Sequence, residues 1–411
     1  MSVRRMGIVL FLSLSLMGAP LFADAPDFSR MVVVGDSLSA GYLSGGLEEE
    51  GQLTGYAALI ASQAGVDLSL PLIAYPGVPN IMELETWGPP PIFGPVPGQS
   101  SGRIDPFTQA MNLAVPGHDA LDALETRPDL PIDSLTDLVL GLPGLLDGVA
   151  LSQVEWAEAL EPSVILLWIG NNDILGAATE GSPELMTDPE VFEAAYGQIF
   201  DRLAATGAPI VVANIPDTTV IAYLTPVSEV SWAMGVPVEL LEVALGVGPE
   251  DYVTLPGLDM ASRILGGTLP GPLPDTMVLD TEEAQQIRER TDLFNAIIAA
   301  KAEQYGSTLV DIRALLERAD AAGAMACGRR LATSFLGGVF SLDGVHPTRT
   351  GYALVANEFI AAINAGLGAD LPPVDLCAVS ASDPLLPPGM SFAPSGLGSP
   401  ARGLLRPGPE R

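Results

Sequence analysis

The sequence of 411 residues is poor in positive charge. Lysine and arginine together number 18, and Lys301 is the only lysine, against 50 aspartates and glutamates, so the formal net charge is −32. A negative field of this size repels phosphate backbones and anionic headgroups, which argues against nucleic-acid binding and against electrostatic docking on membranes. Neutral substrates suit such a surface better. The charge itself is typical of a solubility feature, or of adaptation to a salty medium that screens self-repulsion.

Histidine and cysteine are equally scarce, with two of each: His118, His346, Cys327 and Cys377. Their spacing matches no Cys/His zinc motif, so the sequence predicts no metal centre, and no other motif calls for an organic cofactor. The two cysteines could form a disulfide in an oxidising compartment or exist as free thiols, and the sequence leaves both open.

The first residues predict a secretory signal. Arg4 and Arg5 precede an apolar stretch at 7–18, and small residues at 23–25 provide a cleavage site. This stretch is shorter than the roughly 20 residues that a bilayer span needs, which disfavours a transmembrane anchor. We therefore expect residues 1–25 to be removed, and the mature chain to be exported to the periplasm or the medium without stable membrane insertion.

Short apolar runs alternate with helical patterns along the chain. The runs that predict buried strands are 31–34, 164–168, 210–213, a weaker one at 308–312 and a further candidate at 68–74. The helical patterns cover 56–64, 151–160, 191–206, 282–305 and about 348–365. Apolar strands that alternate with helices favour an α/β fold, a doubly wound parallel sheet with helices on both faces. Functional sites in such folds form at the carboxyl ends of the strands.

Two long stretches rich in Pro and Gly interrupt this alternation, near 75–148 and 218–280. Connections of this length are usually functional loops or small subdomains. A cap over the site and a surface elaboration are equally open interpretations. We expect one domain at 26–380 that contains both insertions, followed by a flexible tail rich in Pro and Gly at 381–411.

Gly35-Asp36-Ser37-Leu38 follows the first predicted strand and places Ser37 just past its carboxyl end. A serine at such a turn is held rigid and exposed, as a nucleophile must be. By itself this four-residue motif is weak, since a polar turn with a capping serine would have the same sequence.

A second motif, Asp343-Gly344-Val345-His346-Pro347, supplies the partners that a serine nucleophile requires. Because His346 follows Asp343 by three positions, Asp343 can accept from one ring nitrogen of His346 while the other nitrogen faces a serine, which selects the tautomer of a general base. Ser37, Asp343 and His346 together therefore predict a catalytic triad.

An acyl-transfer site also needs donors for the oxyanion, and the sequence offers two besides the N–H of Ser37. Asn172, in Gly170-Asn171-Asn172-Asp173 after the strand at 164–168, supplies a side-chain amide. Gly117 supplies a backbone N–H that a larger residue could obstruct. An Asx turn and a plain turn glycine are the ordinary alternatives for these residues.

These four blocks, taken in their order, resemble the SGNH/GDSL hydrolase superfamily of lipases and esterases. The resemblance spans residues 33–347 and implies a flavodoxin-like sheet of about five parallel strands. It also implies that Ser37 is the nucleophile, His346 the base and Asp343 its partner, and that Ser37, Gly117 and Asn172 form the oxyanion hole. Asp173 follows the Asn172 block and is expected to be structural.

Two other residues compete for a role. Ser100 lies in Gly98-Gln99-Ser100-Ser101-Gly102, which formally matches the nucleophile elbow of α/β hydrolases. That elbow needs a strand before it and a helix after it, whereas prolines flank this match, so a Gly-rich turn is the better interpretation. His118 lacks a carboxylate placed as Asp343 is, and is expected to be at most a substrate contact.

The sequence thus predicts an exported serine hydrolase that cleaves carboxylic esters through an acyl-enzyme, without a cofactor. Aromatic residues of the insertions, Trp87, Phe93, Tyr223 and Trp232, favour an acyl chain or lipid ester as substrate. Deacetylation of a polysaccharide by the same triad is an alternative, and a catalytically idle exported binding protein is another. We expect activity to rise as His346 loses its proton, in the range typical of histidine.

Overall fold

The computed structural model describes residues 26–87 and 91–386. Its centre is a parallel sheet in the order β1-β4-β5-β9. The strands are β1 (Met31–Gly35), β4 (Val164–Trp168), β5 (Ile210–Ala213) and β9 (Thr308–Val310). All three pairings are parallel, so the carboxyl ends of the strands share one edge. The four strongest predicted strands are therefore confirmed, in a parallel sheet as the alternation requires.

The fifth position of the sheet is occupied by residues 111–113, which the sequence pattern did not reveal. Val33 of β1 donates from its N–H to the carbonyl of Met111 and accepts from the N–H of Leu113, in a parallel bridge. The predicted strand at 68–74 is wrong, since this segment forms only an isolated bridge. Pro71 lies at its centre and lacks the N–H that a sheet ladder needs.

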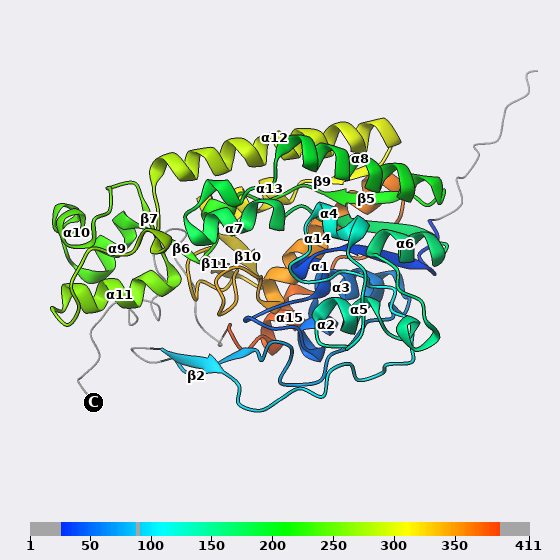
Figure 1. Cartoon of the computed structure of the whole chain (residues 1–411), viewed down its shortest axis with the longest axis horizontal. Helices are drawn as coiled ribbons and strands as arrows, with labels where there is room; N and C mark the ends of the chain where they lie inside the picture. The colour runs from blue at the N-terminus through cyan, green and yellow to red at the C-terminus, as the bar shows by residue number, and fades with distance from the viewer. Residues whose placement is uncertain (1–25, 88–90, 387–411) are drawn as a thin grey trace, which may run out of the picture.

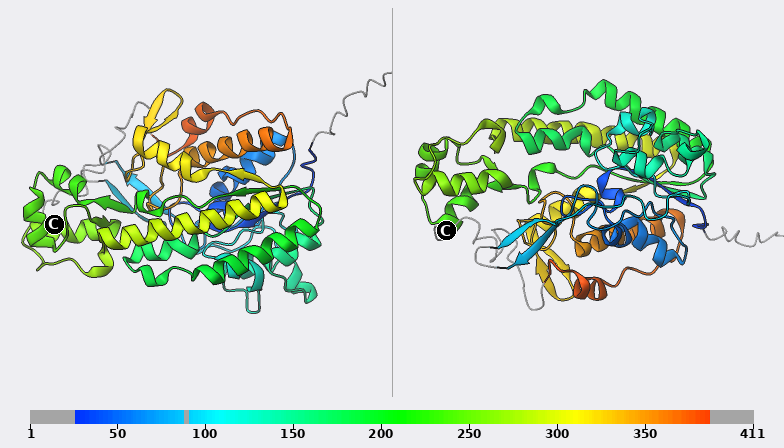
Figure 2. Two further views of the ribbon diagram at one scale, coloured as in Figure 1. Left: turned by 90° about the horizontal axis from the view of Figure 1, so that it is seen from above. Right: turned by 60° about the horizontal axis from the view of Figure 1, so that its bottom comes forward.

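Helices cover both faces of the sheet, as Figures 1 and 2 show. On one face Val33, Leu166 and Val211 pack against α3 and α14. On the other Val32 and Leu167 pack with α4, α6, α8 and α12. The helices of these two layers are α3 (Tyr56–Ala64), α14 (Arg349–Leu367), α4 (Ala120–Glu125), α6 (Gln153–Ala159), α8 (Pro189–Ala205) and α12 (Thr281–Tyr305). Alternate strand residues face opposite layers, which explains why the strands are apolar throughout, and the predicted doubly wound α/β fold is confirmed.

Shorter helices follow the strand ends. These are α1 (Ser37–Ala40), α2 (Glu49–Thr54), α7 (Asn172–Glu180), the 3₁₀ helix η2 (Pro183–Leu185) and α13 (Ile312–Ala322). The α1 and α7 helices begin directly after β1 and β4, so the residues that open them lie at the same edge of the sheet.

The stretch 218–280 folds into a small unit of its own at one end of the molecule (Figure 1). It contains η3 (Thr218–Val220), β6 (Leu224–Pro226), α9 (Val227–Met234), α10 (Val238–Leu245), β7 (Tyr252–Thr254), α11 (Leu255–Leu265), η4 (Asp275–Met277) and β8 (Val278–Leu279). Its strands pair antiparallel in the order β6-β7-β8. The unit joins the segment that carries Asp343 through one bond, from the N–H of Tyr223 to the carbonyl of Gly344.

The stretch 75–148 is not a single appendage. It contains an antiparallel hairpin of β2 (Met82–Thr86) and β3 (Ile92–Pro95), followed by the edge segment 111–113 and α4 of the central fold, and then α5 (Leu135–Leu140) and η1 (Gly144–Asp147). The expected insertion therefore includes parts of the sheet and of one helical layer.

The chain is packed against the domain beyond the expected start of a tail at residue 381. Helix α15 (Leu376–Ser382) is followed by Leu385 and Leu386, which are buried, and Asp383 accepts from the N–H of Thr350 at 2.8 Å. This corrects the expectation for residues 381–386, because buried side chains and a capped helix hold them in place. Residues 387–411 and the predicted signal at 1–25 lie outside the described residues.

A disulfide joins Cys327 to Cys377 and so attaches α15 to the hairpin of β10 (Ala324–Ala326) and β11 (Arg329–Leu331). This decides the question that the sequence left open. Within residues 26–87 and 91–386, none of the helices combines the length and the apolarity needed to cross a membrane.

Candidate active site

Ser37 opens α1 immediately after the turn at the end of β1. The carboxylate of Asp36 caps this helix by accepting from the N–H of Leu38 at 3.0 Å. Gly35 is required here, because a Cβ at this position would lie 2.5 Å from the carbonyl oxygen of Trp168. The turn thus holds Ser37 at the carboxyl edge of the sheet, with only 6% of the residue exposed.

His346 bridges Ser37 and Asp343. Its Nε2 lies 2.8 Å from the Ser37 Oγ, and its Nδ1 lies 2.9 Å from Asp343 Oδ2. A carboxylate accepts only, so Nδ1 carries the proton and Nε2 is left to accept from the serine hydroxyl. The structure therefore brings together the three residues that the sequence paired, in the geometry of a nucleophile, a base and a group that orients the base.

Asp343 is held as a carboxylate despite its burial. Burial alone would raise the pKa of this carboxyl, but the His346 imidazole and the N–H groups of His346 and Val345 outweigh that effect and keep the pKa below its usual value. The N–H of Gly45 also donates to Oδ2 at 2.8 Å. Asp343 is therefore ionised and fixed in direction, as the tautomer of His346 requires.

Tyr42 supports the same pair and was not singled out from the sequence. Its ring centroid lies 4.6 Å from that of His346, and its hydroxyl donates to the carbonyl of Gly45 at 2.6 Å. Burial, with the Asp343 charge in addition, raises the pKa of Tyr42 to about 12, so the hydroxyl stays protonated. No local pattern distinguishes this tyrosine, because its contact with His346 joins opposite ends of the chain.

The two predicted oxyanion donors follow the two segments that flank β1 in the sheet, 111–113 and β4. Asn172 opens α7 after β4, and its amide donates to the carbonyl of His118 at 2.8 Å. Gly117 precedes His118 and has φ +89°, a left-handed conformation that favours glycine, although a Cβ would meet no atom within 4 Å. One N–H of the Asn172 amide serves this bond, and the second is the group that an oxyanion could use.

Asn171, beside the predicted donor, was not singled out from the sequence. It lines the cavity next to Ser37, and its amide donates to Asp36 Oδ2 at 2.8 Å. Burial raises the pKa of Asp36 to about 6 in spite of this hydrogen bond. The side chain of Asn171 thus links the segment after β4 to the turn after β1.

Ser100 and His118 do not join the triad. Ser100 lies in a loop that no helix follows, and its hydroxyl donates to the carbonyl of Ala74 at 2.5 Å. The His118 ring is buried and faces Gln153 and Thr136 rather than the cavity beside Ser37. His118, expected to be at most a substrate contact, therefore does not line this cavity.

A cavity with about 820 Å³ of empty space, part of it open to solvent, lies beside Ser37 and His346. Its walls are almost entirely apolar and come from α13, α14, the segment 339–347 and the start of the 218–280 unit. The main apolar residues are Trp168, Leu175, Ile221, Ile312, Leu315, Leu316, Ala319, Val339, Phe340, Leu354 and Val355. The apolar lining of this cavity suits a hydrocarbon chain next to the serine.

The aromatic residues expected to favour an acyl chain do not line this cavity. Phe93 packs on Phe335 with ring centroids 5.6 Å apart, Trp87 lines a separate cavity, and 55% of Trp232 is exposed. The apolar lining comes instead mainly from helices of the central fold, because the cavity opens between α13 and α14 rather than between the insertions.

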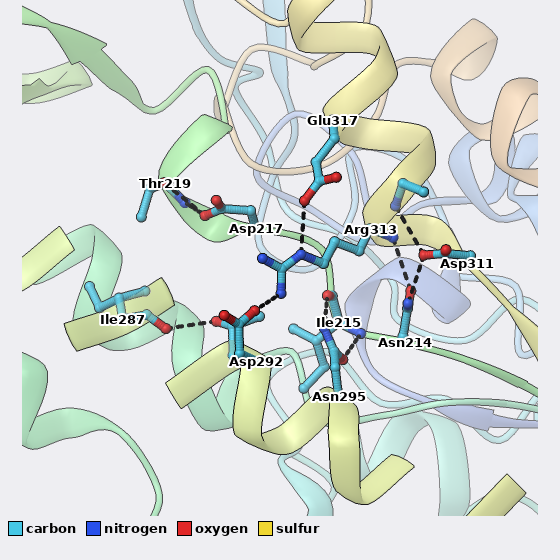
Figure 3. A network of polar contacts seen from close by, with 12 residues as sticks. Asn214, Ile215, Asp217, Thr219, Ile287, Asp292, Asn295, Asp311, Arg313 and Glu317 are labelled. Carbon is cyan, nitrogen blue, oxygen red and sulfur yellow. Dashed lines mark hydrogen bonds and ion pairs between the residues drawn. The ribbon is translucent and has the colours of Figure 1, made fainter. Parts of the chain in front are cut away.

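A polar network fixes one wall of the cavity (Figure 3). The side chain of Asn295 in α12 both donates to and accepts from the backbone of Ile215, at 2.8 Å each, just past β5. Asn214 joins Asp311 and the N–H of Arg313 at the start of α13. Arg313 in turn pairs with Asp292 of α12. These contacts hold α13, which carries part of the cavity wall, against the end of β5.

In the part of the chain that the structure describes, no group of three or more His, Cys, Asp or Glu is arranged to hold a metal ion.

The family described as GDSL-like Lipase/Acylhydrolase matches residues 31–359. Among solved structures, the chain is similar to LAE5, an α/β hydrolase from the metagenome of Lake Arreo, with 14% identity, a TM-score of 0.36, and coverage of 81% of this chain and 93% of that one. The chain is also similar to the W215I variant of Axe2, an acetyl xylan esterase from Geobacillus stearothermophilus. The identity is 14% and the TM-score 0.38, with coverage of 81% of this chain and 93% of that one. With an extracellular lipase from Streptomyces rimosus the identity is 14% and the TM-score 0.35, with coverage of 82% of this chain and 98% of that one. No curated protein matches the sequence significantly.

Proposed function

Because the chain belongs to the GDSL-like lipase/acylhydrolase family, we propose that it hydrolyses carboxylic esters through an acyl-enzyme formed on Ser37. The observation that carries this proposal is the continuous pair of hydrogen bonds from Asp343 through His346 to Ser37, 2.9 and 2.8 Å long. A binding protein has no use for a base aimed at a serine hydroxyl and oriented by a buried carboxylate, which argues against an idle fold.

In the proposed reaction, His346 Nε2 takes the hydroxyl proton as Ser37 Oγ attacks the ester carbonyl. Asp343 stabilises the imidazolium that forms. The same imidazolium then gives its proton to the departing alcohol, and the acyl group stays on Ser37. A water molecule, deprotonated by His346, attacks the acyl-enzyme and releases the carboxylic acid, after which Ser37 regains its proton.

The proposed oxyanion hole consists of the N–H groups of Ser37 and Gly117 and the amide of Asn172. The ends of β1, the 111–113 segment and β4 share one edge of the sheet, which supports their convergence around the carbonyl oxygen. Loss of one donor of this kind typically lowers kcat by about a hundredfold or more.

The apolar cavity supports esters with a hydrocarbon acyl chain, as in a lipase or esterase. Its walls are almost entirely apolar, and they offer few polar groups to a sugar. Deacetylation of a polysaccharide is the second candidate, since the same triad would serve it and the sugar would lie outside the cavity. Export remains part of the proposal, supported by the signal pattern at 1–25 and by a disulfide between Cys327 and Cys377 of the kind that persists in oxidising compartments.

The test is hydrolysis of p-nitrophenyl esters from acetate to dodecanoate, and of acetylated xylan, by the purified protein. We expect turnover that favours the longer esters and is lost in Ser37→Ala but kept in Ser100→Ala. Failure to turn over any ester would refute the function. Activity confined to acetyl groups on the polysaccharide would replace the lipase-like preference with the second candidate.

A matched pair of variants on α13 tests the acyl cavity. Ala319 is buried in the cavity wall, whereas Ala321 on the same helix is exposed. Ala319→Phe should reduce activity on long esters much more than on the acetate ester, because the added ring occupies the acyl site. Ala321→Phe should leave the chain-length profile unchanged. Equal profiles in both variants would show that the acyl chain lies elsewhere.

A further inference from the structure

A fully buried glutamine connects the nucleophile turn to the Gly117 loop. Gln153 opens α6 and has none of its surface exposed, and His118 is 5% exposed. The N–H of Gly35 donates to Gln153 Oε1 at 3.0 Å, and the amide nitrogen of Gln153 lies 3.0 Å from His118 Nδ1. Neither side chain lines the cavity beside Ser37, and the proposed reaction uses neither.

These contacts determine the protonation state of His118. The oxygen of the Gln153 amide is identified by the N–H that it accepts from Gly35, so the other end of the amide is the NH₂ group, which can only donate. His118 Nδ1 must therefore be an unprotonated acceptor. The ring proton lies on Nε2 and donates to Thr136 Oγ1 at 2.9 Å. Burial lowers the pKa of His118, although the charges of Asp122 and Asp119 oppose this change. The lowered pKa favours the same neutral ring.

The backbone of His118 contacts the donors proposed for the oxyanion. Its carbonyl accepts the amide of Asn172 at 2.8 Å, and its N–H donates to the carbonyl of Val115 at 3.2 Å, which closes the turn that contains Gly117. Val115 in turn donates to the carbonyl of Gly35 at 3.1 Å. One residue is thus bonded, directly or through a single neighbour, to the segments that carry all three donors.

We propose that neutral His118, held by Gln153, is a positioning residue that sets the Gly117 N–H, the Asn172 amide and the Ser37 turn at their mutual distances. The inference rests on the proposed function. His118 touches no substrate and transfers no proton. It acts through its two ring bonds, which hold the loop whose carbonyl directs Asn172. A displacement of about 1 Å among such groups costs roughly a hundredfold in rate.

The protein contains two histidines, so the ring nitrogens can be observed directly. Two-bond ¹H–¹⁵N correlation spectra of the ¹⁵N-labelled full chain at neutral pH should show one ring, assigned with a His118→Asn sample, with Nε2 protonated and Nδ1 bare. A His118 ring that is doubly protonated, or protonated on Nδ1, would overturn the inference. This measurement does not depend on any activity.

The kinetic test compares His118→Leu with His118→Asn. Leucine removes both ring bonds, whereas the Asn oxygen can stand where Nδ1 stands and accept from Gln153. We expect His118→Leu to lower kcat on a p-nitrophenyl ester by about tenfold to a hundredfold with little change in KM, because oxyanion donors act in the transition state and the acyl cavity is untouched. His118→Asn should recover most of the loss.

Gln153→Glu is a second variant of nearly the same shape. A carboxylate can still accept from Gly35 but cannot donate to Nδ1, so His118 must move its proton to Nδ1 or gain a second one. The spectra should show this change, with a loss of kcat similar to that of His118→Leu. Asn364→Leu, which removes two hydrogen bonds to Leu371 far from these residues, controls for lost stability and should keep kcat.

Active sites in each preparation are counted with a fluorophosphonate, so that unfolded protein does not count as slow enzyme. A wild type without esterase activity would overturn the proposed function and the positioning role with it. An active wild type whose His118→Leu and Gln153→Glu variants keep kcat within about twofold per active site would overturn the positioning role alone.

Discussion

Asp173 is a buried carboxylate whose ionisation should destabilise the fold near neutral pH. It lies in the first turn of α7, is 1% exposed, and accepts from the N–H of Ala120 at 3.0 Å. Burial, with the charges of Asp119 and Asp36 in addition, raises the pKa of Asp173 from 3.8 to about 7, although the N–H of Ala120 opposes the rise. The folded state thus prefers the protonated carboxyl.

The sign follows from the number of protons bound. Between pH 3.8 and about 7 the folded state binds more protons at Asp173 than the unfolded state does, so the free energy of unfolding falls as the pH rises through this window. The part of this window that lies above pH 5 is about two pH units wide. Each unit corresponds to about 1.4 kcal/mol, so ionisation of Asp173 should cost about 3 kcal/mol between pH 5 and pH 8.

Asp173→Asn keeps the shape of the side chain and removes its titration. The free energy of unfolding of both proteins is measured with urea at about pH 5 and at about pH 8. The difference between variant and wild type should be about 3 kcal/mol more favourable to the variant at pH 8 than at pH 5. Repulsion among the many other carboxylates is present in both proteins, so it cancels in the difference between their free energies of unfolding. Asp370→Asn, at an exposed position, controls for the loss of one charge. The same difference between Asp173→Asn and wild type at both pH values would refute the reasoning.

Two further outcomes are expected. Cys377→Ser opens a disulfide with a sequence separation of 50 and should lower the free energy of unfolding by about 4 kcal/mol, a loss that reductant should reproduce in the wild type. Tyr42→Ala should lower kcat more than Tyr42→Phe, because only phenylalanine keeps the ring against His346; equal losses would assign the effect to the hydroxyl.

The elements of the central fold could be predicted because their signals are local. The runs at 164–168 and 210–213 are strands with those limits, and the pattern at 56–64 is a helix with those limits. Each is defined by residues that are adjacent or one helical turn apart. The edge segment 111–113 gave no such signal, since it is recognised only by its bonds to Val33, far away in the sequence.

The structure of the two insertions could not be predicted from local patterns either. Their length and their Pro and Gly content marked 75–148 and 218–280 as departures from the alternation, but not what they would form. The first contributes an edge segment and α4 to the central fold, and the second is largely a separate unit. Which parts of a long connection join the core depends on the surfaces that surround them, and no local pattern records this.

Local patterns in the sequence were sufficient to predict the alternating α/β fold and to pair Ser37 with Asp343 and His346. Hydrophobic periodicity and motif spacing are properties of neighbouring residues, and the parallel strand ends that follow from them bring separate motifs to one edge. The three-dimensional arrangement was needed to see that Cys327 bonds Cys377, that α13 and α14 line the apolar cavity, and that Gln153 connects His118 to the nucleophile turn. Those features depend on where side chains from distant segments meet, and that is fixed by packing of the whole domain rather than by any stretch of its chain.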